Sequence, residues 1–111
     1  MTTGTQILQA LVEPSRRRLL DAVRDHEQSV NDLVGVVGLS QPGVSRHLRI
    51  LREAGLVSVR LDAQQRFYRA EPLALLGLDQ WLEPYRRYWS AQLDSLGEHL
   101  EDTPHNEKGR D

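Results

Sequence analysis

The stretch from Leu39 to Val57, LSQPGVSRHLRILREAGLV, decides the fold of this chain. Within it Val44, Leu48 and Leu51 recur at three- and four-residue spacing, so on a helix they lie along one narrow arc. Polar and basic residues occupy most of the remaining positions. The pattern predicts a helix over residues 41–54, with an apolar face against a core and a basic face away from it.

Both ends of this helix carry the expected sequence signals. Ser40 can cap the N-terminus, and Pro42 and Gly43 fall in the first turn, where amide hydrogens have no intrahelical partner. Gly55 follows Ala54 and suits the end of the helix, because glycine adopts the left-handed conformation without a steric cost.

Another helix is expected directly upstream, in the segment SVNDLVGVVGLS from Ser29 to Ser40. Ser29 and Asp32 resemble a capping box, with Asp in place of the usual Glu. Gly38 is well placed to end this helix. Only two residues then separate it from the next cap, so the two helices must cross steeply. That is the geometry of a helix-turn-helix.

The rest of the chain supplies the elements around this pair. Two short helices are expected upstream, at residues 6–11 and from Pro14 to about His26. Downstream, LVSVRL and RFYRA are β-prone segments separated by DAQQ, which predicts a two-stranded hairpin over residues 56–70. A last helical region opens at Pro72, with a break expected near Pro84.

This order of elements predicts a mainly α fold with a β-hairpin wing, the winged helix-turn-helix. A length of 111 residues fits one domain, expected over residues 1–101, with a long final helix at about 78–101. The polar residues 102–111 are expected to form a disordered tail. The longest apolar run, LALLGL, is too short to span a bilayer, and the N-terminus does not resemble a signal peptide. We therefore expect a cytoplasmic protein with no membrane partner.

The outer face of the helix over residues 41–54 carries groups that bind DNA. Gln41, Ser45, Arg49 and Arg52 lie on the arc beside the apolar face, and Arg46 lies further round. Amide, hydroxyl and guanidinium groups of this kind reach base edges and phosphates in a major groove.

Two residues of this helix, His47 and Arg52, allow more than one interpretation. His47, on the opposite border, fits a phosphate contact and a half-buried hydrogen-bonding role equally well. Arg52 lies near the C-terminal end, where solvation alone accounts for it.

The charge distribution favours a polyanionic partner in the middle of the chain. The net charge is −2, but residues 40–70 hold six Arg against two acidic residues, a local balance of +4. Residues 71–111 hold four basic against nine acidic residues, a balance of −5. DNA would therefore be attracted to the helix-turn-helix and hairpin and repelled by the C-terminal part.

At these residues the sequence resembles the ArsR/SmtB family of bacterial transcriptional repressors. The resemblance covers roughly residues 5–70 and is most specific at SRHLRILREAGLV, Ser45 to Val57. Pro14-Ser15-Arg16 is similar to a Pro-Thr-Arg stretch of that family. The resemblance implies that the helix from Gln41 enters the major groove of double-stranded DNA and that the hairpin contacts neighbouring phosphates as a wing. Together with the helix wheel, it assigns DNA binding to Gln41, Ser45, Arg46, His47, Arg49, Arg60, Gln64, Gln65 and Arg66. The wing tip LDAQQR lacks the Gly that is common in the family, which leaves its turn type open.

The sequence departs from the metal-sensing members of the family. Some of them carry Cys pairs in the helix that here reads VNDLVGVV, and this chain has no Cys. Others place Asp and His ligands on the last helix, a pattern that the acidic residues there, with His99 and His105, do not reproduce. We therefore expect no metal site and no cofactor, with a weak Zn or Ni site near these two His as the alternative.

The last helix carries four of the six aromatic residues of the chain, within WLEPYRRYW. The resemblance implies a homodimer formed by the first and last helices. A chain of this size would also struggle to cover the apolar residues of both helices alone. Dimer contacts are expected from Ile7, Leu8, Leu11, Trp81, Leu82, Tyr85, Trp89, Leu93 and Leu96. The alternative is a small-molecule pocket lined by the aromatics, where Arg86 and Arg87 could meet an anionic ligand.

These observations predict a dimeric repressor that is not metal-responsive and reads a palindromic operator through residues 41–54. Two alternatives stay open: a winged-helix protein–protein interaction module, and a repressor whose aromatic last helix binds a small organic effector. No Ser-His-Asp arrangement, phosphate-binding Gly loop or strong metal cluster indicates an enzyme.

Overall fold

The computed structural model describes the backbone of residues 4–101 and the side chains of residues 4–97. The predicted disordered tail, His105 and the side chain of His99 lie outside these described residues. The chain divides after Gly77 into a winged body and a C-terminal unit, which consists of most of helix α5 (Leu76–Glu101). We describe the two units separately.

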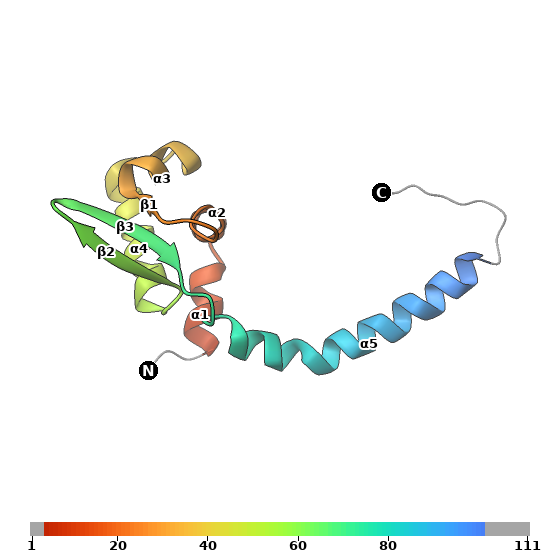
Figure 1. The fold of residues 1–111 in the computed structure, drawn as a ribbon. Helices are drawn as coiled ribbons and strands as arrows, with labels where there is room; N and C mark the ends of the chain where they lie inside the picture. Colours follow the sequence, from red (N-terminus) through yellow and green to blue (C-terminus); the bar gives the residue numbers. More distant parts are fainter. Residues whose placement is uncertain (1–3, 102–111) are drawn as a thin grey trace. The chain divides into compact units, whose positions relative to one another are not determined.

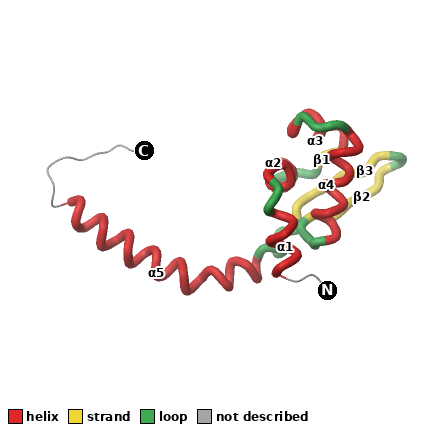
Figure 2. The backbone as a smooth tube through the Cα atoms, turned by 180° about the vertical axis from the view of Figure 1, so that it is seen from behind, coloured by secondary structure: helices red, strands yellow, loops and turns green. Residues whose placement is uncertain are grey.

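The winged body is mainly α and ends in a small antiparallel sheet (Figure 1). Its elements are α1 (Gly4–Leu11), α2 (Pro14–Ala22), β1 (Gln28–Ser29), α3 (Val30–Val37), α4 (Gln41–Glu53), β2 (Val57–Asp62) and β3 (Gln65–Ala70). The strand order is β1-β3-β2. The β2–β3 hairpin lies beside α4, as Figure 2 shows in yellow and red. The predicted winged helix-turn-helix fold is therefore confirmed.

The helix pair begins and ends through the predicted caps. The Ser29 hydroxyl accepts a hydrogen bond from the Asp32 amide at 3.2 Å, and the Asp32 carboxylate accepts one from the Ser29 amide at 3.3 Å. Gly38 closes α3 with a φ of 71°, in the left-handed region. The Ser40 hydroxyl accepts from the Gly43 amide at 3.3 Å and starts α4. The short turn therefore brings α4 directly against α3.

The core of the body lies where the inner faces of α2, α3 and α4 meet the sheet. Val44, Leu48 and Leu51 of α4 have no exposed surface. The buried residues that complete this core are Ala10, Leu19, Val23, Leu33, Val37, Ala54, Leu56, Val57 and Tyr68. The apolar arc predicted for α4 is therefore the face that seats this helix on the body.

The first half of the body differs from the prediction in one respect. Helix α2 ends at Ala22 instead of near His26, because the chain then forms strand β1, which was not predicted from the sequence. In this strand Gln28 pairs with Tyr68 of β3, and the Gln28 side-chain amide donates to the Ala22 carbonyl at 2.6 Å. The sheet pairing outweighs the helical pattern that continued past Ala22.

The last helix also differs from the prediction. It begins at Leu76 instead of after Pro72, and it continues through Pro84, so the break expected there was wrong. Because proline has no amide hydrogen, Pro84 cannot donate one backbone hydrogen bond. The other backbone hydrogen bonds of this 26-residue helix keep it continuous. None of the described helices is long and apolar enough to cross a membrane.

Candidate nucleic-acid interface

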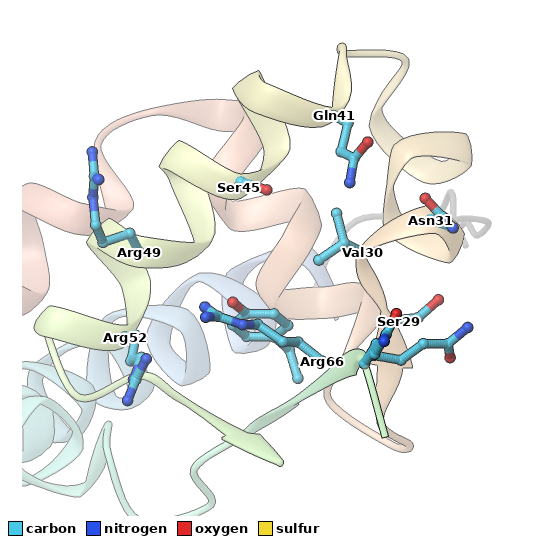
Figure 3. A pocket seen from close by; sticks show the side chains of 11 residues that line it. Ser29, Val30, Asn31, Gln41, Ser45, Arg49, Arg52 and Arg66 are labelled. Atoms are coloured by element: carbon cyan, nitrogen blue, oxygen red, sulfur yellow. The ribbon is translucent and has the colours of Figure 1, made fainter. Parts of the chain in front are cut away.

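A groove of about 490 Å³ lies between α4, the N-terminal end of α3 and the wing (Figure 3). Along one side Gln41, Ser45, Arg49 and Arg52 follow α4, at spacings of three and four residues that place them on one face. The groove is completed by Ser29, Val30, Asn31, Gln64, Gln65, Arg66 and Tyr68. The outer face of α4 therefore forms one wall of a concave surface.

The electrostatics of this groove are set by its arginines. Arg49 and Arg52 lie on the α4 wall and Arg66 comes from β3, while none of the described residues that line the groove is acidic. The other polar lining groups are amides and hydroxyls, which hydrogen-bond to phosphate and to base edges. A groove with this chemistry suits a polyanionic backbone.

Six of the nine residues predicted to bind DNA line this groove, and three do not. The six are Gln41, Ser45, Arg49, Gln64, Gln65 and Arg66. Arg46 is exposed on α4 but lies outside the groove. His47 and Arg60 have partners within the chain. The assignment of all nine residues to DNA contacts stays a prediction.

Arg60 of β2 is engaged in an ion pair. Its Nε donates to the Glu27 carboxylate at 3.1 Å, and a second nitrogen donates to the other oxygen of that carboxylate. Asp62 lies 3.6 Å from the guanidinium, whose carbon lies 4.8 Å from the centre of the Phe67 ring. The hydrogen bond from Arg60 lowers the pKa of Glu27, and the same bond raises the pKa of Arg60. Arg60 therefore ties the wing to the segment that leads into β1.

His47 of α4 is half-buried and hydrogen-bonds within the chain. Its Nδ1 lies 3.2 Å from a terminal nitrogen of Arg16, in the first turn of α2. Of the two roles that the sequence allows for His47, this contact realises the half-buried one. A phosphate contact through the other ring nitrogen is still compatible with it.

Helix α5 carries a row of exposed apolar side chains. Trp81, Tyr85, Trp89, Leu93 and Leu96 are each about half exposed or more, and Leu82 is half-buried. The rings of Trp81 and Tyr85 lie 5.1 Å apart. Arg86 and Arg87, considered as ligand contacts, instead pair with Asp79 and Glu83 at 3.0 Å and 2.7 Å.

The three apolar residues of α1 predicted to form a dimer contact differ in their surroundings. Leu8 is half exposed, whereas Ile7 and Leu11 pack in part against the core of the body. Of these three residues, Leu8 therefore exposes the largest share of its surface to a partner.

The structure adds residues that the sequence reading left out. Arg52 shares the predicted polar arc of α4 but was interpreted as solvated, and it lines the groove one turn beyond Arg49. Ser29, Asn31 and Tyr68 come to the groove from β1, α3 and β3, respectively. No local pattern marks these three, because only tertiary packing brings them to α4. Within the described residues there is no group of three or more His, Cys, Asp or Glu that could hold a metal ion.

Comparison with known proteins places the chain in a family. Residues 13–59 match the model of the bacterial regulatory proteins of the arsR family. The HTH-type transcriptional regulator Rv2034 of Mycobacterium tuberculosis is 32% identical over 85 residues, which cover 77% of each protein. The biofilm growth-associated repressor of Agrobacterium fabrum is 40% identical over 63 residues, or 57% of this chain and 54% of that protein. The crystal structure of NolR from Sinorhizobium fredii superposes with a TM-score of 0.60 at 36% identity, over 73% of this chain and 82% of that one.

The chain therefore belongs to the ArsR family of bacterial regulatory proteins, as its resemblance implied. It spans about half the length of several curated relatives that it matches. Rv2034 is named as a transcriptional regulator and the Agrobacterium fabrum protein as a repressor, neither as an enzyme, which agrees with the prediction of a non-catalytic protein.

Proposed function

We propose that this protein is a DNA-binding transcriptional regulator that inserts α4 into a major groove and lays the wing on the adjacent backbone. One observation carries the proposal. The groove between α4 and the wing gathers three arginines, with amides and hydroxyls on the α4 wall. Arginine and amide side chains on a recognition helix read base edges, and the wing arginine suits a phosphate.

The test is a fluorescence anisotropy titration with the DNA upstream of the protein's own gene, run at several salt concentrations. Arg49→Ala removes a groove arginine and should weaken binding roughly tenfold and reduce the salt slope by about one. Arg24→Ala removes the same charge from an exposed pair with Asp25, outside the groove, and should bind like wild type. Equal losses in both variants would mean that only net charge matters and would contradict the proposal.

The regulator acts as a homodimer on a palindromic site. The exposed apolar row of α5 and the exposed Leu8 of α1 support this part of the proposal, because buried pairing would remove these side chains from water. Sedimentation velocity tests it. Trp89→Glu should produce monomers, whereas Ser90→Glu adds the same charge one position away, off the apolar row, and should remain a dimer. A monomeric wild type would contradict this part.

Repression without a metal signal completes the proposal. The chain has no Cys, so thiolate ligands are not available. Repeating the titration with Zn and with a chelator should leave the affinity unchanged. Release of DNA by Zn would transfer the sensing role to ligands outside the described groove. A promoter–reporter assay with and without the protein distinguishes repression from activation.

A further inference from the structure

The side chain of Arg16 joins three elements of the winged body. It lies in the first turn of α2, and its Nε donates to the Ala10 carbonyl of α1 at 2.6 Å. A terminal nitrogen donates to the Gln9 carbonyl at 3.4 Å. The other terminal nitrogen lies 3.2 Å from Nδ1 of His47 on α4. One guanidinium therefore caps the carbonyl end of α1 and reaches the helix proposed to read DNA.

This contact determines where the proton of His47 lies. A guanidinium is always protonated and can only donate, so the Nδ1 of His47 must accept. A neutral imidazole that accepts at Nδ1 carries its hydrogen on Nε2. Because His47 is half-buried and bound on one side, Arg16 also restricts the rotation of the ring. In this arrangement Nδ1 of His47 is occupied by Arg16, and Nε2–H is the hydrogen-bond donor that the ring can offer to another group.

We propose that Arg16 is a positioning residue for DNA binding, which holds the His47 ring so that its Nε2–H donates to a DNA phosphate. The inference rests on the proposed function, since it concerns how the same surface engages DNA. It assigns Arg16 a role beyond stability, although Arg16 itself belongs to α2 and not to the recognition helix.

The neighbouring residue Arg17 provides a matched control. Its guanidinium donates to the carbonyls of Leu11 and Val12 at 2.6 and 3.1 Å, so it also satisfies the end of α1. The structure gives it no hydrogen bond to α4 among the described contacts. Arg17→Ala therefore removes the same charge and the same kind of helix-end contact while leaving the His47 ring untouched.

DNA affinity is measured for the full chain on one duplex. Arg16→Ala should weaken binding about tenfold, the effect of losing one charge-assisted hydrogen bond, and Arg17→Ala less than about twofold. Because Arg16 acts through His47, the double variant Arg16→Ala/His47→Ala should bind no more weakly than His47→Ala alone. Equal losses in Arg16→Ala and Arg17→Ala, or additive losses in the double variant, would overturn the proposal.

A spectroscopic readout separates positioning from a structural role. Nitrogen NMR of the imidazole in the DNA-free protein should report the Nε2–H form of His47 in wild type and in Arg17→Ala, and a mixture of forms in Arg16→Ala. An unchanged His47 spectrum in Arg16→Ala would overturn the role of Arg16, whereas the proposed function as a DNA-binding regulator would still stand. Wild type that binds no duplex would instead overturn the proposed function, and this role of Arg16 with it.

Two conservative variants keep the test valid if Arg16→Ala does not fold. Arg16→Lys retains the charge but cannot reach three acceptors at once, so it should still weaken binding. His47→Asn offers an amide oxygen near the position of Nδ1 and no group at Nε2. It should fold as stably as wild type yet bind DNA as weakly as His47→Ala. Binding of His47→Asn at the wild-type level would show that the Nε2–H group is not used.

Discussion

Helices α4 and α5 are both amphipathic, but the apolar face of α4 is buried and that of α5 is exposed. The apolar residues of α4, such as Leu48, have no exposed surface, so this helix is held by its own chain. The apolar row of α5 is exposed, with Leu93 64% accessible. The comparison teaches that a hydrophobic stripe predicts a buried face, but not whether the same chain or a second chain covers it. A helix held by its own chain can offer its polar face to a ligand, whereas α5 offers its apolar face.

The largest expected effect tests this difference directly. Leu48→Ala should lower the free energy of unfolding by about 2–5 kcal/mol, because it leaves a cavity in the core of the body. Leu93→Ala removes the same atoms from α5 and should cost under about 0.5 kcal/mol, provided the protein is dilute enough to be monomeric. Urea denaturation followed by circular dichroism measures both. Similar losses would mean that α5 is packed within its own chain.

The polar faces provide the next comparison. Arg52 lines the groove on α4, whereas Arg87 on α5 pairs with Glu83 one turn away. Arg52→Ala should weaken DNA binding roughly tenfold, and Arg87→Ala should change it less than about twofold. Anisotropy titrations on the same duplex give both values. An Arg87 effect as large as that of Arg52 would extend the DNA-binding surface onto α5.

A smaller effect concerns the wing, which is tied to the body by an ion pair instead of by core packing. The pKa of Glu27 in the folded protein is lowered from its ordinary value of 4.5 by the hydrogen bond from Arg60. The stabilisation is therefore fully present above that ordinary value and is lost as the pH falls through the lower, folded-state pKa.

The measurement compares wild type with Glu27→Gln by urea denaturation across this pH range. The wild type should unfold at higher urea near neutral pH, and the difference should shrink once the pH falls below 4.5. A difference that stays constant with pH would show that the carboxylate charge contributes nothing. Because both side chains are well exposed, we expect added salt to reduce the difference as well.

The smallest expected effect lies at the wing tip. Ala63, in the two-residue turn between β2 and β3, has a φ of 57°, which costs a residue with a Cβ about 1 kcal/mol or more. Ala63→Gly should stabilise the protein by under about 1 kcal/mol, because glycine removes this strain but loses more entropy on folding. The thermal midpoint measures the gain. A lower midpoint would indicate that the turn tolerates Ala63 without strain.

The helix-turn-helix could be predicted from sequence because its signals are local. The Ser29 cap, the Gly38 turn and the Ser40 cap each act within four residues, and all three are present in the structure. Strand β1 could not be predicted, because its two residues pair with Phe67 and Tyr68 far along the chain. Local pattern carries no information about such a partner.

The candidate site shows the same division. The α4 wall could be predicted, because Gln41, Ser45 and Arg49 share a helical face that the sequence spacing defines. The opposite wall depends on how α3 and β3 pack, so Asn31 gave no signal. The contact between Arg16 and His47 joins residues 31 positions apart and needed coordinates.

The pairing of β1 with β3 encloses the whole helix pair between two segments of one sheet. Gln28 and Ser29 precede α3, and their partners Tyr68 and Phe67 come after α4 and β2. The Ala70 amide then donates to the Val23 carbonyl at 3.0 Å, which closes the same loop. On the ribosome, a nascent chain that already contains α3 and α4 still lacks β3, the strand that pairs with β1. The helix-turn-helix is therefore completed only after residue 70 has emerged. A chain cut before β3 would contain both helices without the sheet pairing that joins their two ends.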